Sequence, residues 1–174
     1  MIIRTKCLVK VYRDCVEIVT YSPEDTQQIG RILGSYAEAG HVYLLSGALG
    51  SGKTCFTQGI LWGLDGKEFA RSPTFVLLAE YEARIPLYHA DLYRLGSEIE
   101  TIELGIEEYI FGDGVCVIEW ADRAPEYLDS VEHIAVMFNH VESDHRRVTI
   151  SHKDHKYDRA VNAIKTYYDS NRVY

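Results

Sequence analysis

The sequence predicts one α/β domain over residues 1–174, with a mixed but mostly parallel central sheet flanked by helices. Three observations lead to this prediction. A glycine-rich pattern at residues 47–54 lies between an apolar run and a helical pattern. Strand and helix-start signals alternate through most of the chain. After residue 114, β-rich runs follow one another with little helix between them, which predicts antiparallel strands toward the C-terminus.

The N-terminal part predicts two strands and a helix. The runs CLVKVY and CVEIVTY are rich in β-formers and would form a hairpin that turns at residues 13–14. Ser22 followed by Pro23 and two acids is typical of a helix start. We expect this helix to run to Ala39 and to stop at Gly40.

The later part of the chain continues the alternation. Ser97 and Glu100 form a capping-box pattern for a short helix that ends at Gly105. Further strands are expected at 75–82, 86–91, 115–118, 131–138 and 146–151, and a final helix at 154–168.

The glycine-rich segment reads GALGSGKT and fits the phosphate-loop pattern G-x-x-x-x-G-K-[ST]. The apolar run VYLL at 42–45 precedes it and apolar residues at helical spacing follow it, which is the strand–loop–helix context of a P-loop NTPase fold. Gly47, Gly50 and Gly52 permit the tight turn that directs amide groups at phosphate oxygens.

Side chains of the loop predict a nucleotide with magnesium. Lys53 would reach the β- and γ-phosphates, and the Thr54 hydroxyl would ligate Mg²⁺. We expect Leu49, Ser51 and Cys55 to complete the segment that binds ATP or ADP.

A phosphate loop also needs an acid near Mg²⁺, commonly at the end of a buried strand. The apolar run VCVI ends in Glu119, which makes this residue the stronger candidate. The run LYHA ends in Asp91, but His89 interrupts it, and Pro86 indicates an edge strand or a strand start.

The segment RSPTF at 71–75 lies between the loop and these acids. Pro73 forces Ser72 toward extended geometry, which predicts a rigid bend. Thr74 would offer a hydroxyl to the γ-phosphate or its attacking water, or else belongs to an ordinary turn. Trp120 either belongs to the core or covers the nucleotide site.

Composition narrows the class of protein. Hydrophobic residues make up 47% of the chain, no apolar run approaches the length of a membrane span, and the N-terminus lacks a signal-peptide core. The four cysteines form no C-x-x-C pair, so we expect reduced thiols of a cytoplasmic protein.

Charge argues against a primary nucleic-acid binder. Residues 1–144 carry 11 Lys and Arg against 23 Asp and Glu, whereas residues 145–174 carry 7 against 3. Phosphate backbones are bound by clustered cations, which only the tail offers. That tail is either a solvated terminal helix or a contact for RNA or an acidic partner.

Missing motifs argue against two classes of nucleotide-binding protein. No N-K-x-D stretch is present to recognise guanine, which argues against a Ras-like GTPase. No arginine-rich lid of a small-molecule kinase is evident either. A nucleoside or small-molecule kinase stays open because of scattered arginines at 71, 84, 94 and 123.

Four strings in order, GALGSGKT, RSPTF, HADLYRL (89–95) and VIEWADR (117–123), resemble the bacterial TsaE family. The resemblance covers residues 17–151. It implies a small P-loop ATPase that supports TsaB and TsaD, which install threonylcarbamoyl on the adenosine beside the anticodon of a tRNA. It further implies that ATP hydrolysis sustains turnover of that complex and that tRNA is reached through the partners.

The resemblance also assigns roles to matching residues. It implies that Lys53 binds the phosphates and that Thr54 and Glu119 bind Mg²⁺. It also implies that Asp91 acts as a base or positions the attacking water. Thr74 belongs to the switch-like segment.

The sequence departs from the family pattern in several places. Ala48 stands where the family often has an acid, and Asp122 replaces the commoner Glu. Residues 1–15 and the basic tail at 152–174 extend beyond the usual ends. A nucleotide-binding scaffold without meaningful turnover is a further alternative.

Overall fold

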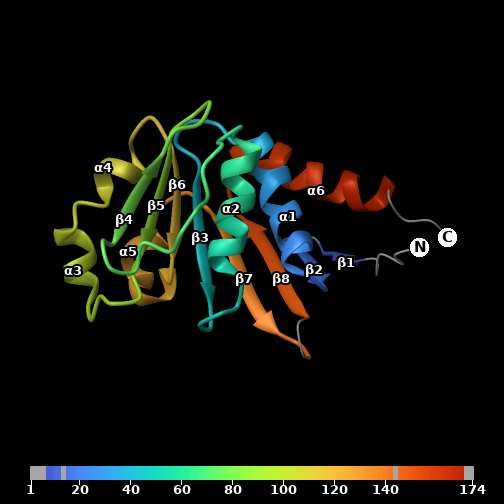
Figure 1. The fold of residues 1–174 in the computed structure, drawn as a ribbon, viewed down its shortest axis with the longest axis horizontal. Coiled ribbons are helices and arrows are strands. Elements are labelled where there is room, and N and C mark those ends of the chain that lie inside the picture. Colours follow the sequence, from blue (N-terminus) through green and yellow to red (C-terminus); the bar gives the residue numbers. More distant parts are fainter. Residues whose placement is uncertain (1–6, 13–14, 143–144, 171–174) are drawn as a thin grey trace.

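One eight-stranded sheet runs through the part of the chain described in this computed structural model, which comprises residues 7–12, 15–142 and 145–170 (Figure 1). The strand order is β1-β2-β8-β7-β3-β6-β5-β4. The strands are β1 (Leu8–Val11), β2 (Cys15–Thr20), β3 (Val42–Gly47), β4 (Leu78–Tyr81), β5 (Leu87–Asp91), β6 (Val115–Glu119), β7 (Ile134–His140) and β8 (Arg146–His152).

Helices connect these strands and flank the sheet (Figure 1). The α-helices are α1 (Pro23–Ser35), α2 (Lys53–Gly63), α3 (Glu98–Glu103), α4 (Glu107–Ile110), α5 (Pro125–Leu128) and α6 (Asp158–Ser170). Short 3₁₀ turns lie at Ala121–Arg123 and His155–Tyr157. None of the described helices is long and apolar enough to cross a membrane.

The predicted mixed sheet is confirmed, but parallel pairing is limited to its centre. Strands β7, β3, β6 and β5 pair in parallel, while β1, β2, β8 and β4 join antiparallel. Three of the seven junctions are therefore parallel, fewer than a mostly parallel sheet would have. The reason is that the N-terminal hairpin β1–β2 extends the sheet beyond β8.

The core has two layers, one on each face of the sheet. Alternate residues of a strand point to opposite faces. In β3, Tyr43 and Leu45 join the cluster formed with α1, α2 and α6. Val42 and Leu44 join the cluster formed with the α3–α5 side. The same alternation turns Glu119 and Asp91, the last residues of β6 and β5, toward the α2 face.

Helices α1 and α2 pack so closely that their backbones touch. A Cβ added at Gly30 would meet the carbonyl oxygen of Phe56, and one added at Gly59 would meet the carbonyl oxygen of Gln27. The same holds one turn further along each helix, at Gly34 and Gly63. This glycine seam fixes the position of α2, the helix that follows the phosphate loop.

Helix α1 begins as predicted and ends early. The Ser22 side chain accepts a hydrogen bond from the Asp25 amide, as expected of an N-cap. The helix ends at Ser35 instead of Ala39. Arg84 explains the difference, because its guanidinium donates to the carbonyl of Gly34 at 2.8 Å and thereby satisfies the helix end from a distant loop.

The strand expected at 75–82 is also shorter, because residues 74–76 form a turn. The Val76 amide donates to the carbonyl of Pro73 at 3.0 Å. Leu77 has a φ of 66°, a left-handed conformation that is strained for a bulky residue. Phe75 and Val76 are consequently left exposed instead of paired in a sheet.

Other expectations hold with shifted boundaries. Strands β1 and β2 pair as a hairpin, although the predicted turn at residues 13–14 lies outside the described residues. Ser97 caps α3 as predicted. Pro86 immediately precedes β5, so it marks a strand start, and β4 covers that edge. Strand β7 begins at Ile134 instead of residue 131, and α6 begins at Asp158.

Candidate nucleotide site

The phosphate loop connects β3 to α2 and has the backbone of an anion cradle. Gly47, Gly50 and Gly52 have φ values of 142°, 72° and 109°, all in the left-handed range that favours glycine. Gly52 caps α2 without any side-chain hydrogen bond. The first amides of α2 are therefore available to an anion, which the positive end of the helix also attracts.

Two side chains of the loop point to an anionic ligand. Ser51 is fully buried, and its Oγ has no hydrogen-bond partner among the described residues. Lys53 Nζ donates to the carbonyls of Gly47 at 2.7 Å and Ala48 at 3.1 Å. Ala48 lacks the acidic side chain that the family often has at this position, but its backbone carbonyl accepts a hydrogen bond from Lys53. Both carbonyls are neutral, so they leave the charge of the lysine ammonium uncompensated for a phosphate.

Burial lowers the pKa of Lys53, and nearby acids oppose this effect. The acids are Glu119, Asp91 and Asp122, in that order. Asp122, the departure from the family pattern, therefore adds negative charge near Lys53 although it does not line the site.

Trp120 lies directly over Lys53. Lys53 Nζ is 3.8 Å from the centre of the indole ring, a cation–π distance. Trp120 has a φ of 59°, and its ring centroid lies 4.8 Å from that of Tyr93. The indole packs against the α3–α5 core and also lines the site, so both interpretations of this residue describe part of its environment.

Glu119 contacts side chains of both helix α2 and strand β5. The hydroxyl of Thr54 donates to Glu119 Oε1 at 2.8 Å, and His89 Nε2 lies 2.9 Å from the same oxygen. Glu119 is 3% exposed. The predicted pair Thr54 and Glu119 is therefore in direct contact at the mouth of the loop.

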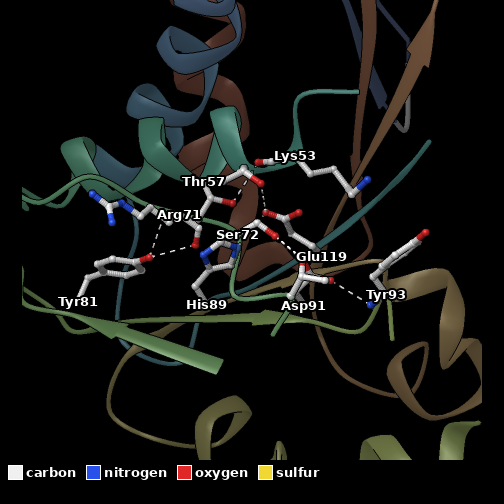
Figure 2. A network of polar contacts seen from close by, with 11 residues as sticks. Lys53, Thr57, Arg71, Ser72, Tyr81, His89, Asp91, Tyr93 and Glu119 are labelled. Atoms are coloured by element: carbon white, nitrogen blue, oxygen red, sulfur yellow. Dashed lines mark hydrogen bonds and ion pairs between the residues drawn. The ribbon is translucent and has the colours of Figure 1, made fainter. Parts of the chain in front are cut away.

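Asp91 has different partners (Figure 2). Ser72 Oγ and Thr74 Oγ1 each lie 2.6 Å from Asp91 Oδ2 and 2.6 Å from each other. The Tyr93 amide donates to Asp91 Oδ1 at 2.9 Å, as in an Asx turn. Two hydroxyl protons serve the three oxygen–oxygen contacts, so the segment 71–77 is tied to this carboxylate.

These groups line one hollow of about 290 Å³. It brings together every predicted site residue except Gly47, the last residue of β3. The residues that line it are Leu49, Gly50, Ser51, Gly52, Lys53, Thr54, Cys55, Ser72, Thr74, Asp91, Tyr93, Glu119 and Trp120.

Sequence reasoning missed Ser72 and Tyr93 as site residues. Ser72 had a signal, a second hydroxyl in RSPTF two positions before Thr74. Tyr93 acts through its backbone amide and its ring, and its only signal was its position two residues after Asp91. His89 was interpreted as an interruption of the strand, and the structure gives it a contact with Glu119 instead.

A second hollow of about 490 Å³ continues around the outside of the loop. It shares Gly50, Ser51, Gly52 and Cys55 with the first hollow and extends to Tyr21. Burial and the charge of Glu24 raise the pKa of Cys55 to about 11, so this cysteine is a neutral thiol between the two hollows.

The donor set fits magnesium and phosphate together. Hard cations prefer hydroxyl, carboxylate and phosphate oxygens, which Thr54 and Glu119 offer beside the loop. The glycine conformations, the orphaned Ser51 hydroxyl and Lys53 fit an anion of the size of a phosphate chain.

Comparisons with known proteins point to one family. Residues 20–149 match the model of the family described as Threonylcarbamoyl adenosine biosynthesis protein TsaE. A tRNA threonylcarbamoyladenosine biosynthesis protein TsaE from Treponema pallidum is 47% identical over 113 residues, or 63% of this chain and 84% of the relative. Its counterpart from Bacillus subtilis is 38% identical over 140 residues, or 80% and 87%.

A solved structure shows the same fold. The crystal structure of Bacillus subtilis YdiB superposes with a TM-score of 0.75 at 30% sequence identity, and the match covers 92% of this chain and 97% of that one. The match to the family model spans most of the chain and includes the loop and both acids. The chain therefore belongs to the TsaE family of tRNA threonylcarbamoyladenosine biosynthesis proteins.

Proposed function

We propose that this protein binds and hydrolyses ATP with Mg²⁺ to support a TsaB–TsaD pair in forming threonylcarbamoyladenosine on tRNA in the cytoplasm. The observation that carries the proposal is the 2.8 Å hydrogen bond from Thr54 to Glu119 at the mouth of a complete phosphate loop. It pairs the two groups that hold Mg²⁺ in P-loop NTPases.

Lys53 and the loop amides would hold the phosphate chain, and Thr54 and Glu119 would hold Mg²⁺ directly or through water. A magnesium ion held by these residues would supply positive charge against the charge that develops during phosphoryl transfer. Asp91 would orient the attacking water and accept its proton, because its carboxylate is held by Ser72, Thr74 and the following turn.

The nucleoside would lie in the second hollow, which is continuous with the loop and passes Tyr21. ATP is the expected nucleotide because the chain has no N-K-x-D motif to select guanine. A titration in which GTP binds at least tenfold more tightly than ATP would contradict this assignment.

Dependence on partners follows from the charge around the site. An arginine finger raises phosphoryl-transfer rates by about 10³ to 10⁵. Among the residues that the structure describes, no arginine lines the hollow that contains Lys53, Asp91 and Glu119. We therefore expect slow hydrolysis by the isolated protein and faster hydrolysis when a partner completes or rearranges the site.

Phosphate release measured with and without TsaB and TsaD tests the proposal. Release that rises with the partner pair supports it. Full-speed hydrolysis by the isolated protein, unchanged by the partners, would contradict the partner dependence. Transfer of phosphate to a metabolite would identify a kinase, and binding without release in any mixture would identify a scaffold.

A further inference from the structure

His89 is a buried polar residue that the mechanism above does not use. It is the third residue of β5 and is 0% exposed. On the face of β5 and β6 that carries it, the neighbouring core residues Leu87, Val115 and Val117 are apolar. A histidine at this position therefore requires an explanation.

Packing alone does not explain the imidazole. Its Nδ1 has no hydrogen-bond partner among the described residues. An unpaired buried polar group costs about 1–3 kcal/mol, which a leucine of similar size would avoid. The ring of Tyr81 lies alongside at a centroid distance of 6.3 Å and would pack equally well on an apolar side chain.

The polar contact of His89 goes to the acid assigned to Mg²⁺. His89 Nε2 lies 2.9 Å from Glu119 Oε1, the oxygen that also accepts from Thr54. A carboxylate only accepts hydrogen bonds, so Nε2 must carry a proton and act as the donor. The direction of this hydrogen bond is therefore from His89 to Glu119.

Two donors on one oxygen fix the rotation of the carboxylate. Both contacts from described residues go to Oε1, which leaves Oε2 for a metal ion or one of its waters. His89 does not line the hollow, so it reaches the site only through Glu119. Outer partners of this kind typically change metal affinity by about 10- to 100-fold when they are removed.

We propose that His89 is a positioning residue that donates from Nε2–H to Oε1 and thereby holds the Glu119 carboxylate in the orientation that Mg²⁺ requires. The proposal rests on the proposed function, since it concerns the same metal site. It predicts that the donor matters and that the imidazole as such does not.

The test is calorimetric titration of full-length protein with ADP, with and without Mg²⁺. In His89→Leu the donor is lost, and the enhancement of ADP affinity by Mg²⁺ should fall about tenfold or more, with metal-free affinity unchanged. In His89→Gln the side-chain amide can reach the same oxygen, so the enhancement should stay within about threefold of the wild-type value. Equal enhancement in wild type and His89→Leu, or equal loss in both variants, would overturn the proposal.

His41 provides a matched control. It is also a buried histidine whose Nδ1 has no partner among the described residues. It lies just before β3, at the amino-terminal ends of the parallel strands, against the ring of Tyr157. His41→Leu should lower the melting temperature without changing the Mg²⁺ enhancement. A loss in His41→Leu equal to that in His89→Leu would attribute the effect to general destabilisation and would overturn the proposal.

A measurement on the wild-type protein keeps the proposal testable if His89→Leu does not fold. Nitrogen-15 shifts of the imidazole should show His89 with the proton on Nε2. A proton on Nδ1 instead would overturn the proposal. Wild-type protein without any Mg²⁺ enhancement would contradict the proposed function itself, and this inference with it.

Discussion

Glu119 and Asp91 end neighbouring parallel strands and are opposite each other in the register of β6 and β5. They are almost equally buried, at 3% and 2% exposure. Their partners differ completely. Glu119 is held by Thr54 of helix α2 and His89 of strand β5, whereas Asp91 is held by Ser72 and other groups outside the helices and strands.

The two acids at these strand ends are almost equally buried, so burial does not distinguish their roles. The residues that hydrogen-bond to each acid do. A carboxylate fixed to the phosphate helix suits a metal that must stay with the nucleotide. A carboxylate tied to an exposed segment suits a group whose position changes when that segment moves.

The largest effect should come from Asp91→Asn. An acid that orients water acts mainly in the transition state, so turnover should fall by about 10² or more while ATP affinity stays nearly intact. Partner-stimulated phosphate release and an ATP titration measure the two quantities. Loss of Mg²⁺-dependent binding in this variant, with binding kept in Glu119→Gln, would reverse the two assignments.

Glu119→Gln should show the opposite pattern in binding. We expect Mg²⁺-dependent ATP affinity to fall by about tenfold or more, and hydrolysis to fall with it, because the metal stabilises bound nucleotide and transition state together. ATP affinity without Mg²⁺ is the internal control. A thermal melt must first show that both near-isosteric variants fold, and normal turnover in both would exclude these acids from the site.

Removal of the two hydroxyls that donate to Asp91 should give smaller, non-additive losses of turnover. Ser72→Ala and Thr74→Val each remove one of two donors to the same oxygen, so each should lower turnover by about fivefold. The double variant should lose more than the product of the single effects, since the carboxylate then lacks both donors. Independent effects that simply multiply would indicate that the hydroxyls do not act through a shared oxygen.

The smallest effect is on the pH dependence of the melting temperature. It involves His41, which lies outside the site of the two acids. Burial lowers the pKa of His41 in the folded protein. The contribution of neutral His41 to the free energy of unfolding is therefore fully present above the unfolded pKa of about 6.5. It is lost as pH falls below that value, because the unfolded chain takes up the proton more readily. Melting temperatures between pH 7.5 and 5.5 should fall less in His41→Leu than in wild type, and equal falls would contradict this account.

Local signals in the sequence predicted much of the fold and most of the site. The loop, its flanking strand and helix, the caps at Ser22 and Ser97, and the strand that ends in Glu119 all depend on neighbouring residues. The division of the chain into a core with an N-terminal extension at 1–15 and a tail at 152–174 stays a prediction.

Features that depend on distant contacts could not be predicted. The early end of α1 depends on Arg84, some fifty positions away. The turn at 74–76 follows a hydrogen bond from Thr74 to Asp91, which is distant in the sequence. Likewise, nothing near His89 in the sequence indicates that Glu119 lies beside it, because the parallel pairing of β5 and β6 brings them together.

The glycine seam has a mechanical consequence for the cycle of the protein. With the backbone of α1 pressed against that of α2, neither helix can slide without separating from the other. Amide hydrogens in α1 and α2 should therefore exchange with solvent only when the whole fold opens, while those at 72–77 should exchange through local opening. Nucleotide-dependent movement would then be confined to the segment beside Asp91, which carries the exposed Phe75 and Val76.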